Sequence, residues 1–200
     1  MIVCAKSHDA AGEVSKLFRE RQCDKIYAAL CFGWPEWDEL KITSRIRVSQ
    51  RRFKQKIDPG GKSARTVATV AARGWLRLAP HRGRPCSLVW LVPHTGRRHQ
   101  LRLHMASVGH AIVGDYTYAE DASTFRMFLH ACALRLPLPW GTVEAAASLT
   151  PNGWDDFWWP SEENEMRSTD AWPDAAGRLC TGSWSTPEHV RLRKSWQQKL

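Results

Sequence analysis

One stretch of the sequence is dense in side chains that bind anions or transfer protons. It reads PHTGRRHQLRLH from Pro93 to His104, directly after an apolar run. Thr95 and Gly96 predict a turn, and apolar residues then recur at helical spacing until about Gly109. The first N–H groups of a helix have no partner inside the helix and attract negative charge. The stretch therefore predicts an anion-binding site at a turn that leads into a helix.

Two arginines of this stretch, Arg98 and Arg102, stand four residues apart. On one helix they would share a face and repel each other by roughly 0.2 to 0.5 kcal/mol. We therefore expect a negative group between or beside them. The alternative is a pair of solvated arginines on an exposed face, which leaves the adjacent turn and the pair His99 and Gln100 unexplained.

Positive charge is concentrated in the first three quarters of the chain. Residues 1–150 hold 23 Lys and Arg against 12 Asp and Glu, whereas residues 151–200 hold 6 against 8. The segment 41–65 alone holds nine basic residues and a single acid, Asp58. Basic clusters bind polyanions by releasing condensed counterions, so nucleic acid is the leading candidate partner. The alternative is that the charge serves solubility.

The elements that would position these residues are mainly strands. Residues 25–32 alternate with period two, which predicts a strand with Ile26 and Leu30 on one face and Tyr27 on the other. An amphipathic helix is predicted over 8–22 and a short buried strand over Ile2–Ala5. Further strands are predicted at residues 42–48, 66–71, 75–79 and 87–92.

Composition changes at about residue 150. The six tryptophans beyond this point stand among Pro, Gly, Ser, Asp and Glu and have no regular spacing. We predict one domain over residues 1–150 and a poorly ordered Trp-rich tail over 151–200 that could bind a protein partner.

The remaining composition favours an intracellular protein, cytoplasmic or nuclear. The six cysteines are dispersed and include no CxxC pair, which fits a reducing compartment. No stretch approaches the about 20 apolar residues of a membrane span, so we expect no membrane partner.

Several motifs, in order, resemble one enzyme family. TGRRHQLRLH at 95–104, GHAIVGD at 109–115 followed by Tyr118, LHA at 129–131 and KIYAAL at 25–30 are similar to motifs of the large ribosomal-subunit type of pseudouridine synthases. The resemblance covers roughly residues 2 to 139. It implies an α+β fold, with a mixed and mainly antiparallel sheet, flanking helices and a central cleft.

The resemblance also implies a chemistry without a cofactor or metal. A uridine is flipped out of its RNA, an aspartate drives breakage of the glycosidic bond, and uracil rejoins through carbon five. Tyr27 would face the base, Leu101 would pack against it, and Arg102 would pair with the aspartate. The implied RNA contacts are Arg45, Arg51, Arg52, Arg97, Arg98, His99 and Gln100.

The family motif with the nucleophilic aspartate, HRLD or HQLD, should lie upstream of Ile2 and is not in this sequence. We therefore expect a catalytic domain without its first strands, with an exposed sheet edge. Arg102 should then lack a fixed counter-charge. The chain should bind RNA, without distinction of rRNA, tRNA or mRNA, and should not isomerise uridine. A second departure, Ala111 in place of the family's proline, touches no chemistry.

Two other functions are compatible with these residues. The first is a non-catalytic RNA-binding or regulatory protein, either an isoform or a pseudoenzyme. The second is a metal hydrolase, whose ligands would be His94, His99, His104, His110 and His130. His99 and His104 are five residues apart, which does not match the i, i+4 spacing of helical zinc ligands, so no metal is expected. A monomer is expected in either case.

Overall fold

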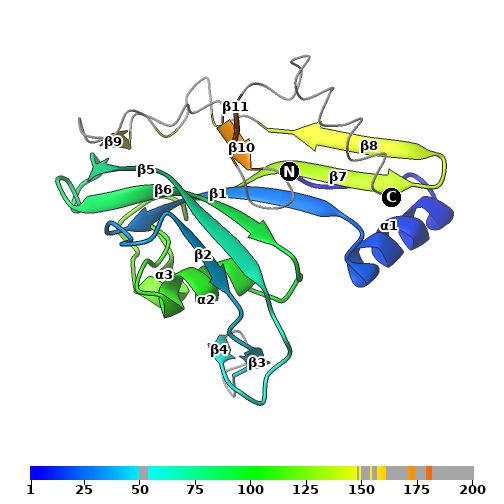
Figure 1. Cartoon of the computed structure of the whole chain (residues 1–200), viewed down its shortest axis with the longest axis horizontal. Helices are drawn as coiled ribbons and strands as arrows, with labels where there is room; N and C mark the ends of the chain where they lie inside the picture. The colour runs from blue at the N-terminus through cyan, green and yellow to red at the C-terminus, as the bar shows by residue number, and fades with distance from the viewer. Residues whose placement is uncertain are drawn as a thin grey trace.

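The computed structural model describes residues 1–49, 54–147, 149, 154, 157–160, 171–173 and 179–181. Its main feature is a seven-stranded sheet in the order β2-β5-β6-β1-β7-β8, with β9 paired to β5 (Figure 1). All pairings among the described strands are antiparallel. The α+β class predicted from the sequence is confirmed, without a parallel pair in the described part of the chain.

The elements follow the chain in this order: α1 His8–Glu20, β1 Asp24–Phe32, β2 Glu39–Ile42, β3 Ile46–Val48, β4 Gln55–Ile57, β5 Thr66–Leu76, β6 Pro85–Pro93, α2 Gln100–Ser107, α3 Tyr116–Ala119, β7 Leu129–Leu138, β8 Gly141–Ala146, β9 Trp158–Pro160, β10 Ala171–Pro173 and β11 Leu179–Thr181. Strands β3 and β4, and strands β10 and β11, form two-stranded sheets of their own.

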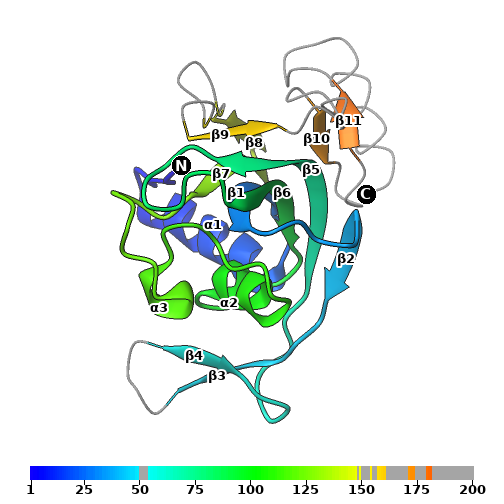
Figure 2. The ribbon, with the colours of Figure 1, turned by 90° about the vertical axis from the view of Figure 1, so that its left-hand side faces the viewer.

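Strand β1 lies inside the sheet and carries a core on each face. Ile26, Ala28 and Leu30 belong to one apolar cluster, which includes Trp90. Ala29 and Cys31 belong to a second cluster, with Tyr27 packed against it. The alternation predicted from the sequence is therefore confirmed. Helices α2 and α3 lie beside the second face, and the β3–β4 hairpin projects beyond them (Figures 1 and 2).

Other predicted strands needed adjustment. Residues 66–71 and 75–79 were expected as two strands but form the single strand β5, which carries a register shift between Val70 and Ala72. The expected strand 42–48 divides into the end of β2 and the whole of β3. The ladder to β6 continues through Gly74, so no break separates the two expected strands.

The first residues of the chain do not form the predicted strand. Residues 1–5 are exposed and pair with no described strand, and Ile2 is 87% exposed, so that prediction is wrong. A strand needs a neighbour for its backbone groups, and no described strand takes this place. Helix α1 follows, capped by Ser7, and Leu17 packs near Leu136 of β7.

Two tryptophans beyond residue 150 belong to the main core. Trp154 and Trp158 are buried in the cluster that contains Leu30 and Phe128, and β9 pairs with β5. The domain boundary at residue 150 stays a prediction. The remaining tail residues lie almost entirely outside the described residues. None of the described helices is long and apolar enough to cross a membrane.

Strand β8 is an edge of the large sheet. Among the described strands it pairs with β7 alone. Val143 in β8 and Trp140 in the turn before it are 48% and 60% exposed. Truncation of the sheet stays a prediction. An exposed edge strand favours aggregation, so we expect β8 to lower the solubility of the chain.

Candidate active site

A pocket of about 350 Å³ opens between the start of β1, the end of β6 and the start of α2. Its lining includes Tyr27, Leu101 and Arg102, the three residues singled out for catalysis and base packing. These residues come from a strand and a helix that are about 75 positions apart in the sequence. The complete lining is Lys25, Tyr27, Pro93, Thr95, Gly96, Arg97, His99, Gln100, Leu101, Arg102, Met127 and Leu129.

The turn before α2 is held by Gln100. Its Oε1 accepts hydrogen bonds from the Thr95 hydroxyl (2.6 Å) and from the Arg97 N–H (3.1 Å). Its Nε2 donates to the Arg65 carbonyl and to the Thr66 hydroxyl, both at 2.9 Å. The amide is 3% exposed, and all its hydrogen-bonding capacity is used. A contact between Gln100 and RNA stays a prediction, while the observed bonds assign the side chain to the turn.

Helix α2 begins later than the sequence suggested. It starts at Gln100, after His99 in a left-handed conformation with φ of 56°. Arg98 lies in the preceding turn and is exposed. The expectation that Arg98 and Arg102 share a helix face is therefore wrong, because the reversal at His99 separates them.

Arg102 has a carboxylate partner, Asp115. Its Nε donates to Asp115 Oδ2 at 2.9 Å and its Nη2 to Oδ1 at 2.6 Å. Asp115 is 1% exposed and also caps α3 by accepting from the N–H groups of Thr117 and Tyr118. The expectation of an arginine without counter-charge is wrong. Sequence reasoning placed Asp115 in the GHAIVGD motif but did not assign it this contact.

The ion pair has a direct effect on Arg102. The hydrogen bonds that the guanidinium donates to Asp115 raise its pKa, so it stays charged and fixed in direction. The guanidinium also lies 5.1 Å from the ring centroid of Tyr118. Arg102 therefore reaches the pocket already oriented, and its side chain is still 17% exposed.

His99 lies between several cations. Burial, followed by the charges of Arg102 and Arg98, lowers its pKa. Its Nδ1 lies 3.1 Å from the Tyr118 hydroxyl. A neutral imidazole therefore fits this position at neutral pH, and Nδ1 can accept a hydrogen bond from the hydroxyl.

Tyr27 is half-buried at the floor of the pocket. Burial raises the pKa of its hydroxyl, with a smaller contribution from Cys23. It packs against the cluster of Leu101, together with Met127 and Leu129. These apolar side chains give the pocket a surface on which a flat base could stack.

The charges around the pocket are positive. Lys25, Arg97 and Arg102 line it, and its described lining contains neither Asp nor Glu. Lys25 was not singled out from the sequence, although it begins the KIYAAL motif. A pocket with this lining suits a polyanion at its mouth and lacks a carboxylate nucleophile among the described residues.

Five of the seven predicted RNA contacts lie within the described residues. Arg45 is exposed and donates to the Gly61 carbonyl, and Arg97 donates to the Ser63 carbonyl. Arg51 and Arg52 lie outside the described residues. Arg45 adjoins the β3–β4 hairpin, whereas Arg97, His99 and Gln100 line the pocket. The roles of all these residues in RNA binding stay predictions.

The five histidines of the metal-hydrolase alternative do not converge among the described residues. No group of three or more potential metal ligands occurs there. His104, for example, is fully buried and bonded to the Thr66 hydroxyl and the Ser44 carbonyl. His110 contacts the Phe32 carbonyl and His130 the Ala147 carbonyl. The described chain therefore gives that alternative no support.

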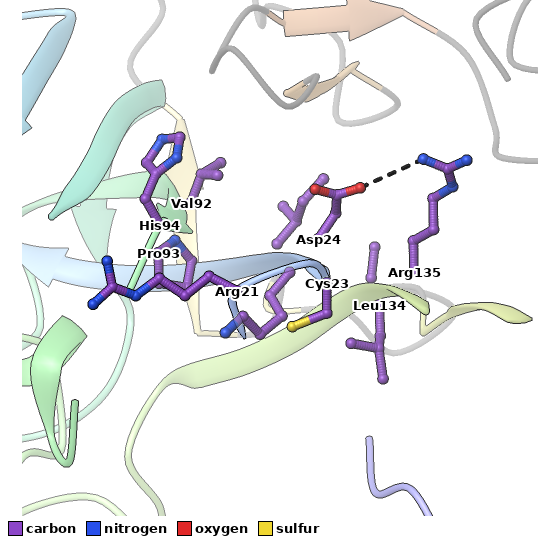
Figure 3. Close-up of a pocket in the computed structure, with 11 residues that line it drawn as sticks. Arg21, Cys23, Asp24, Val92, Pro93, His94, Leu134 and Arg135 are labelled. Carbon is purple, nitrogen blue, oxygen red and sulfur yellow. Dashed lines mark ion pairs between the residues drawn. The ribbon is translucent and has the colours of Figure 1, made fainter. Parts of the chain in front are cut away.

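A second, smaller cavity of about 80 Å³ lies at the start of β1. Asp24 and Arg135 form an ion pair across it at 3.7 Å (Figure 3). Arg135 also pairs with Glu144 at 3.3 Å. The Nε2 atom of His94 is buried and has no hydrogen-bond partner among the described residues, and burial lowers the pKa of this histidine. We infer that this polar cluster helps to hold the start of β1 against β7.

Comparison with known proteins decides the family. A family model described as RNA pseudouridylate synthase matches residues 1–107, more than half of the chain. The chain belongs to the RNA pseudouridylate synthase family. The resemblance drawn from its motifs is thereby confirmed, and the pocket described above lies mainly within the matched segment.

Several relatives are similar over much of the chain. RNA pseudouridylate synthase domain-containing protein 1 of Mus musculus is 37% identical over 163 residues, which cover 76% of this chain and 52% of that protein. The dual-specificity RNA pseudouridine synthase RluA of Vibrio parahaemolyticus is 37% identical over 139 residues, covering 67% and 54%. The chain spans about half the length of the curated relatives it matches.

Solved structures agree with this synthase fold. Human RNA Pseudouridylate Synthase Domain Containing 1 superposes with a TM-score of 0.68 at 29% identity, covering 95% of this chain and 73% of that one. Human RNA Pseudouridylate Synthase Domain Containing 4 has a TM-score of 0.56 at 22% identity, covering 73% and 65%, and supports the fold alone.

Proposed function

We propose that this polypeptide is the greater part of a synthase domain that isomerises uridine to pseudouridine in RNA. The observation that carries the proposal is the convergence of Tyr27, Leu101 and Arg102 on one pocket with a basic rim. Membership in the family and the apolar floor beside the cations support the same reading.

The proposed reaction needs no cofactor. A uridine flipped into the pocket would lie against Leu101 and the Tyr27 ring. A carboxylate supplied by another segment drives cleavage of the bond between ribose C1′ and uracil N1. Uracil then rotates, C5 bonds to C1′, and the C5 proton is lost to a base, for which Tyr27 is our candidate. N1 takes up a proton, so the product is an isomer of the substrate.

Arg102 would orient that carboxylate. Its guanidinium already holds Asp115, but an arginine has five N–H donors, and the pair with Asp115 uses Nε and Nη2. The Nη1 donors could serve a second carboxylate at the pocket. Arg102 in this role is therefore compatible with the ion pair, and replacement by Lys should lose the forked geometry.

The 200-residue polypeptide by itself is expected to be inactive, because the described lining of the pocket contains no carboxylate. The test is incubation of the purified polypeptide with a uridine-containing RNA, followed by mass spectrometry of its nucleosides. We expect no pseudouridine. Its formation would overturn the assignment of the nucleophile to a segment outside this sequence.

RNA binding is proposed to survive without catalysis. The basic segment 41–65 together with Arg97 and Arg98 should bind RNA with an affinity that falls steeply with salt. The double variant Arg97→Ala, Arg98→Ala should weaken binding about tenfold in fluorescence anisotropy, whereas Arg19→Ala, on α1, should have little effect. Equal affinities for the two variants would contradict this surface.

A non-catalytic RNA-binding or regulatory protein is the second candidate, favoured by the absence of Asp and Glu from the described pocket lining. The nucleotide sequence upstream of codon one discriminates between the two. An HRLD or HQLD motif encoded there in frame supports the synthase, and a stop codon or unrelated sequence supports the second candidate.

Three further properties are proposed from composition. We propose an intracellular protein, cytoplasmic or nuclear, that is monomeric and whose residues 151–200 bind a protein partner. Fluorescence microscopy of the tagged protein tests the first property and light scattering the second. For the third, a partner should co-purify with residues 1–200 and not with residues 1–160, which keep both buried tryptophans and β9.

A further inference from the structure

The tyrosine of the motif that follows Asp115, Tyr118, contacts both the β3–β4 hairpin and the pocket lining. Its hydroxyl accepts a hydrogen bond from the Gln55 N–H of β4 at 2.9 Å. The same hydroxyl lies 3.1 Å from His99 Nδ1, before α2. Its ring lies under the Arg102 guanidinium. One side chain thus touches the hairpin and two residues of the pocket lining.

The β3–β4 hairpin depends on such contacts for its position. It forms a two-stranded sheet of its own, with three paired positions, and does not join the large sheet. A short hairpin of this kind is marginally stable by itself. Ile46 at its base packs with Leu103 of α2 and with Tyr118 in a small apolar cluster. His104 adds a hydrogen bond to the Ser44 carbonyl just before β3.

The described residues of the hairpin and its flanks are basic. Arg45, Arg47, Lys54, Lys56 and Lys62 belong to this region, and Asp58 neutralises part of the charge by pairing with Lys56 at 2.8 Å. RNA that binds these cations would contact an element whose position depends partly on Tyr118.

The hydrogen bonds of the Tyr118 hydroxyl are directional. A phenol has one proton to donate. Because the Gln55 N–H can only donate, the hydroxyl accepts there and can donate its own hydrogen bond to His99 Nδ1. This arrangement requires a neutral His99, and the lowered pKa of that residue agrees with it.

We propose that Tyr118 is a positioning residue that ties the basic hairpin to the pocket, so that hairpin placement and Arg102 orientation are set together. The proposal rests on the proposed function for the RNA part, because the hairpin is taken as an RNA contact. Tyr118 acts through Gln55, His99 and Arg102 and is not assigned a contact with the reacting base.

The test compares Tyr118→Phe with Tyr116→Phe. Both variants lose a hydroxyl from the same short helix, but Tyr116 is 73% exposed and serves as the matched control. In Tyr118→Phe the Gln55 amide should exchange with deuterium about three to ten times faster, because its acceptor is gone. RNA affinity should fall by a similar factor, with a weaker salt dependence. Tyr116→Phe should match the wild type in exchange at Gln55.

A second variant reads the pocket side. Tyr118→Phe keeps the ring under Arg102, so the Arg102 Nε–H signal in NMR should stay protected from solvent exchange. Tyr118→Leu removes the ring as well and should accelerate that exchange several-fold. Slow Arg102 exchange in Tyr118→Phe and fast exchange in Tyr118→Leu would show that the ring positions Arg102. The amide NMR spectrum of each variant shows whether it is still folded.

The outcomes are distinct. An unchanged Gln55 exchange rate in Tyr118→Phe would contradict the proposal that the Tyr118 hydroxyl holds the hairpin in place. Faster exchange with unaltered RNA affinity and salt dependence overturns the coupling to RNA. If the wild-type chain binds no RNA while Gln55 exchange still rises, the proposed function and the RNA coupling fail, and the structural tether remains supported.

Discussion

At the scale of single residues, the contact between Arg102 and Asp115 organises the pocket. Both side chains stand in motifs that the sequence analysis singled out, yet the pair itself was not predicted. Arg102 was expected to lack a carboxylate partner, because the family resemblance implies a pair with the nucleophilic aspartate and does not imply a pair with Asp115. Thirteen positions separate the pair, and the chain reverses between them. Only the path of that loop shows that they meet.

Asp115→Asn should destabilise the protein strongly. The carboxylate is 1% exposed, and its loss leaves a largely buried guanidinium without its ion-pair partner. We expect the free energy of unfolding to fall by about 3 kcal/mol in urea denaturation. The control is Asp38→Asn, which loses an ion pair with Arg73 whose acid is 61% exposed, and should cost under about 1 kcal/mol. Comparable losses in the two variants would contradict the buried role of Asp115.

The buried histidines predict a pH dependence of stability. Burial lowers the pKa of His104, whose Nε2 donates to the Ser44 carbonyl and whose Nδ1 contacts the Thr66 hydroxyl. A pKa that is lower in the folded state means that the unfolded chain binds more protons below about pH 6.5. Stability is therefore full above that pH and decreases as the pH falls toward the folded pKa. His94 and His99 act in the same direction.

Denaturant titrations at pH 7.5, 6.5 and 5.5 measure this effect. We expect the free energy of unfolding to decrease at each step downward. His104→Gln should weaken the dependence, while His8→Gln, at the exposed start of α1, should leave it in place. Stability that is constant or increases toward pH 5.5 would contradict the assignment of neutral buried histidines.

At the scale of elements, the sequence predicted what depends on local pattern. The period-two pattern of residues 25–32 identified β1 and its two faces, because successive side chains of a strand point to opposite faces of the sheet. The start of α2 was placed too early, because the left-handed His99 that interrupts the helical run leaves no mark in the pattern. Strand Ile2–Ala5 was wrong, since apolar composition does not supply a neighbouring strand.

The loop after α2 depends on Gly114. Its φ is +77°, and a Cβ atom there would meet the Arg126 carbonyl. Gly109 also has a positive φ, +86°, but open space around it. Gly109→Ala should cost about 1 to 2 kcal/mol from backbone strain alone, and Gly114→Ala should cost at least about 2 kcal/mol more. Calorimetric unfolding of both variants measures the difference. Equal costs would show that the loop tolerates the added methyl group and has another arrangement.

At the scale of the whole molecule, the core extends past the expected end of the domain. Trp154 and Trp158 lie in the main cluster, and Phe128 packs against Trp154 with ring centroids 5.6 Å apart. The tryptophans beyond residue 150 have no regular spacing in the sequence. Such spacing indicates that they pack against something but not against which surface. Composition could therefore mark a change near residue 150 but not the anchoring of the chain just beyond it.

Two truncations test this extension of the core. Residues 1–160 keep both buried tryptophans and β9, and residues 1–150 lose them. We expect residues 1–150 to be less stable than residues 1–160 by at least about 3 kcal/mol, the usual cost of removing one large buried aromatic side chain. Equal unfolding midpoints and slopes would support the predicted boundary at residue 150 and contradict the contribution of Trp154 and Trp158.

The most direct test of the account is pseudouridine formation by a polypeptide in which a segment carrying the HRLD motif precedes Met1. Mass spectrometry of nucleosides from a treated RNA should find pseudouridine with this extended polypeptide and none with the 200 residues alone. Activity should disappear in the extended Arg102→Ala and Tyr27→Ala variants if they remain folded. Pseudouridine made by the unextended chain, or a folded and RNA-binding extended chain that makes none, would contradict the account.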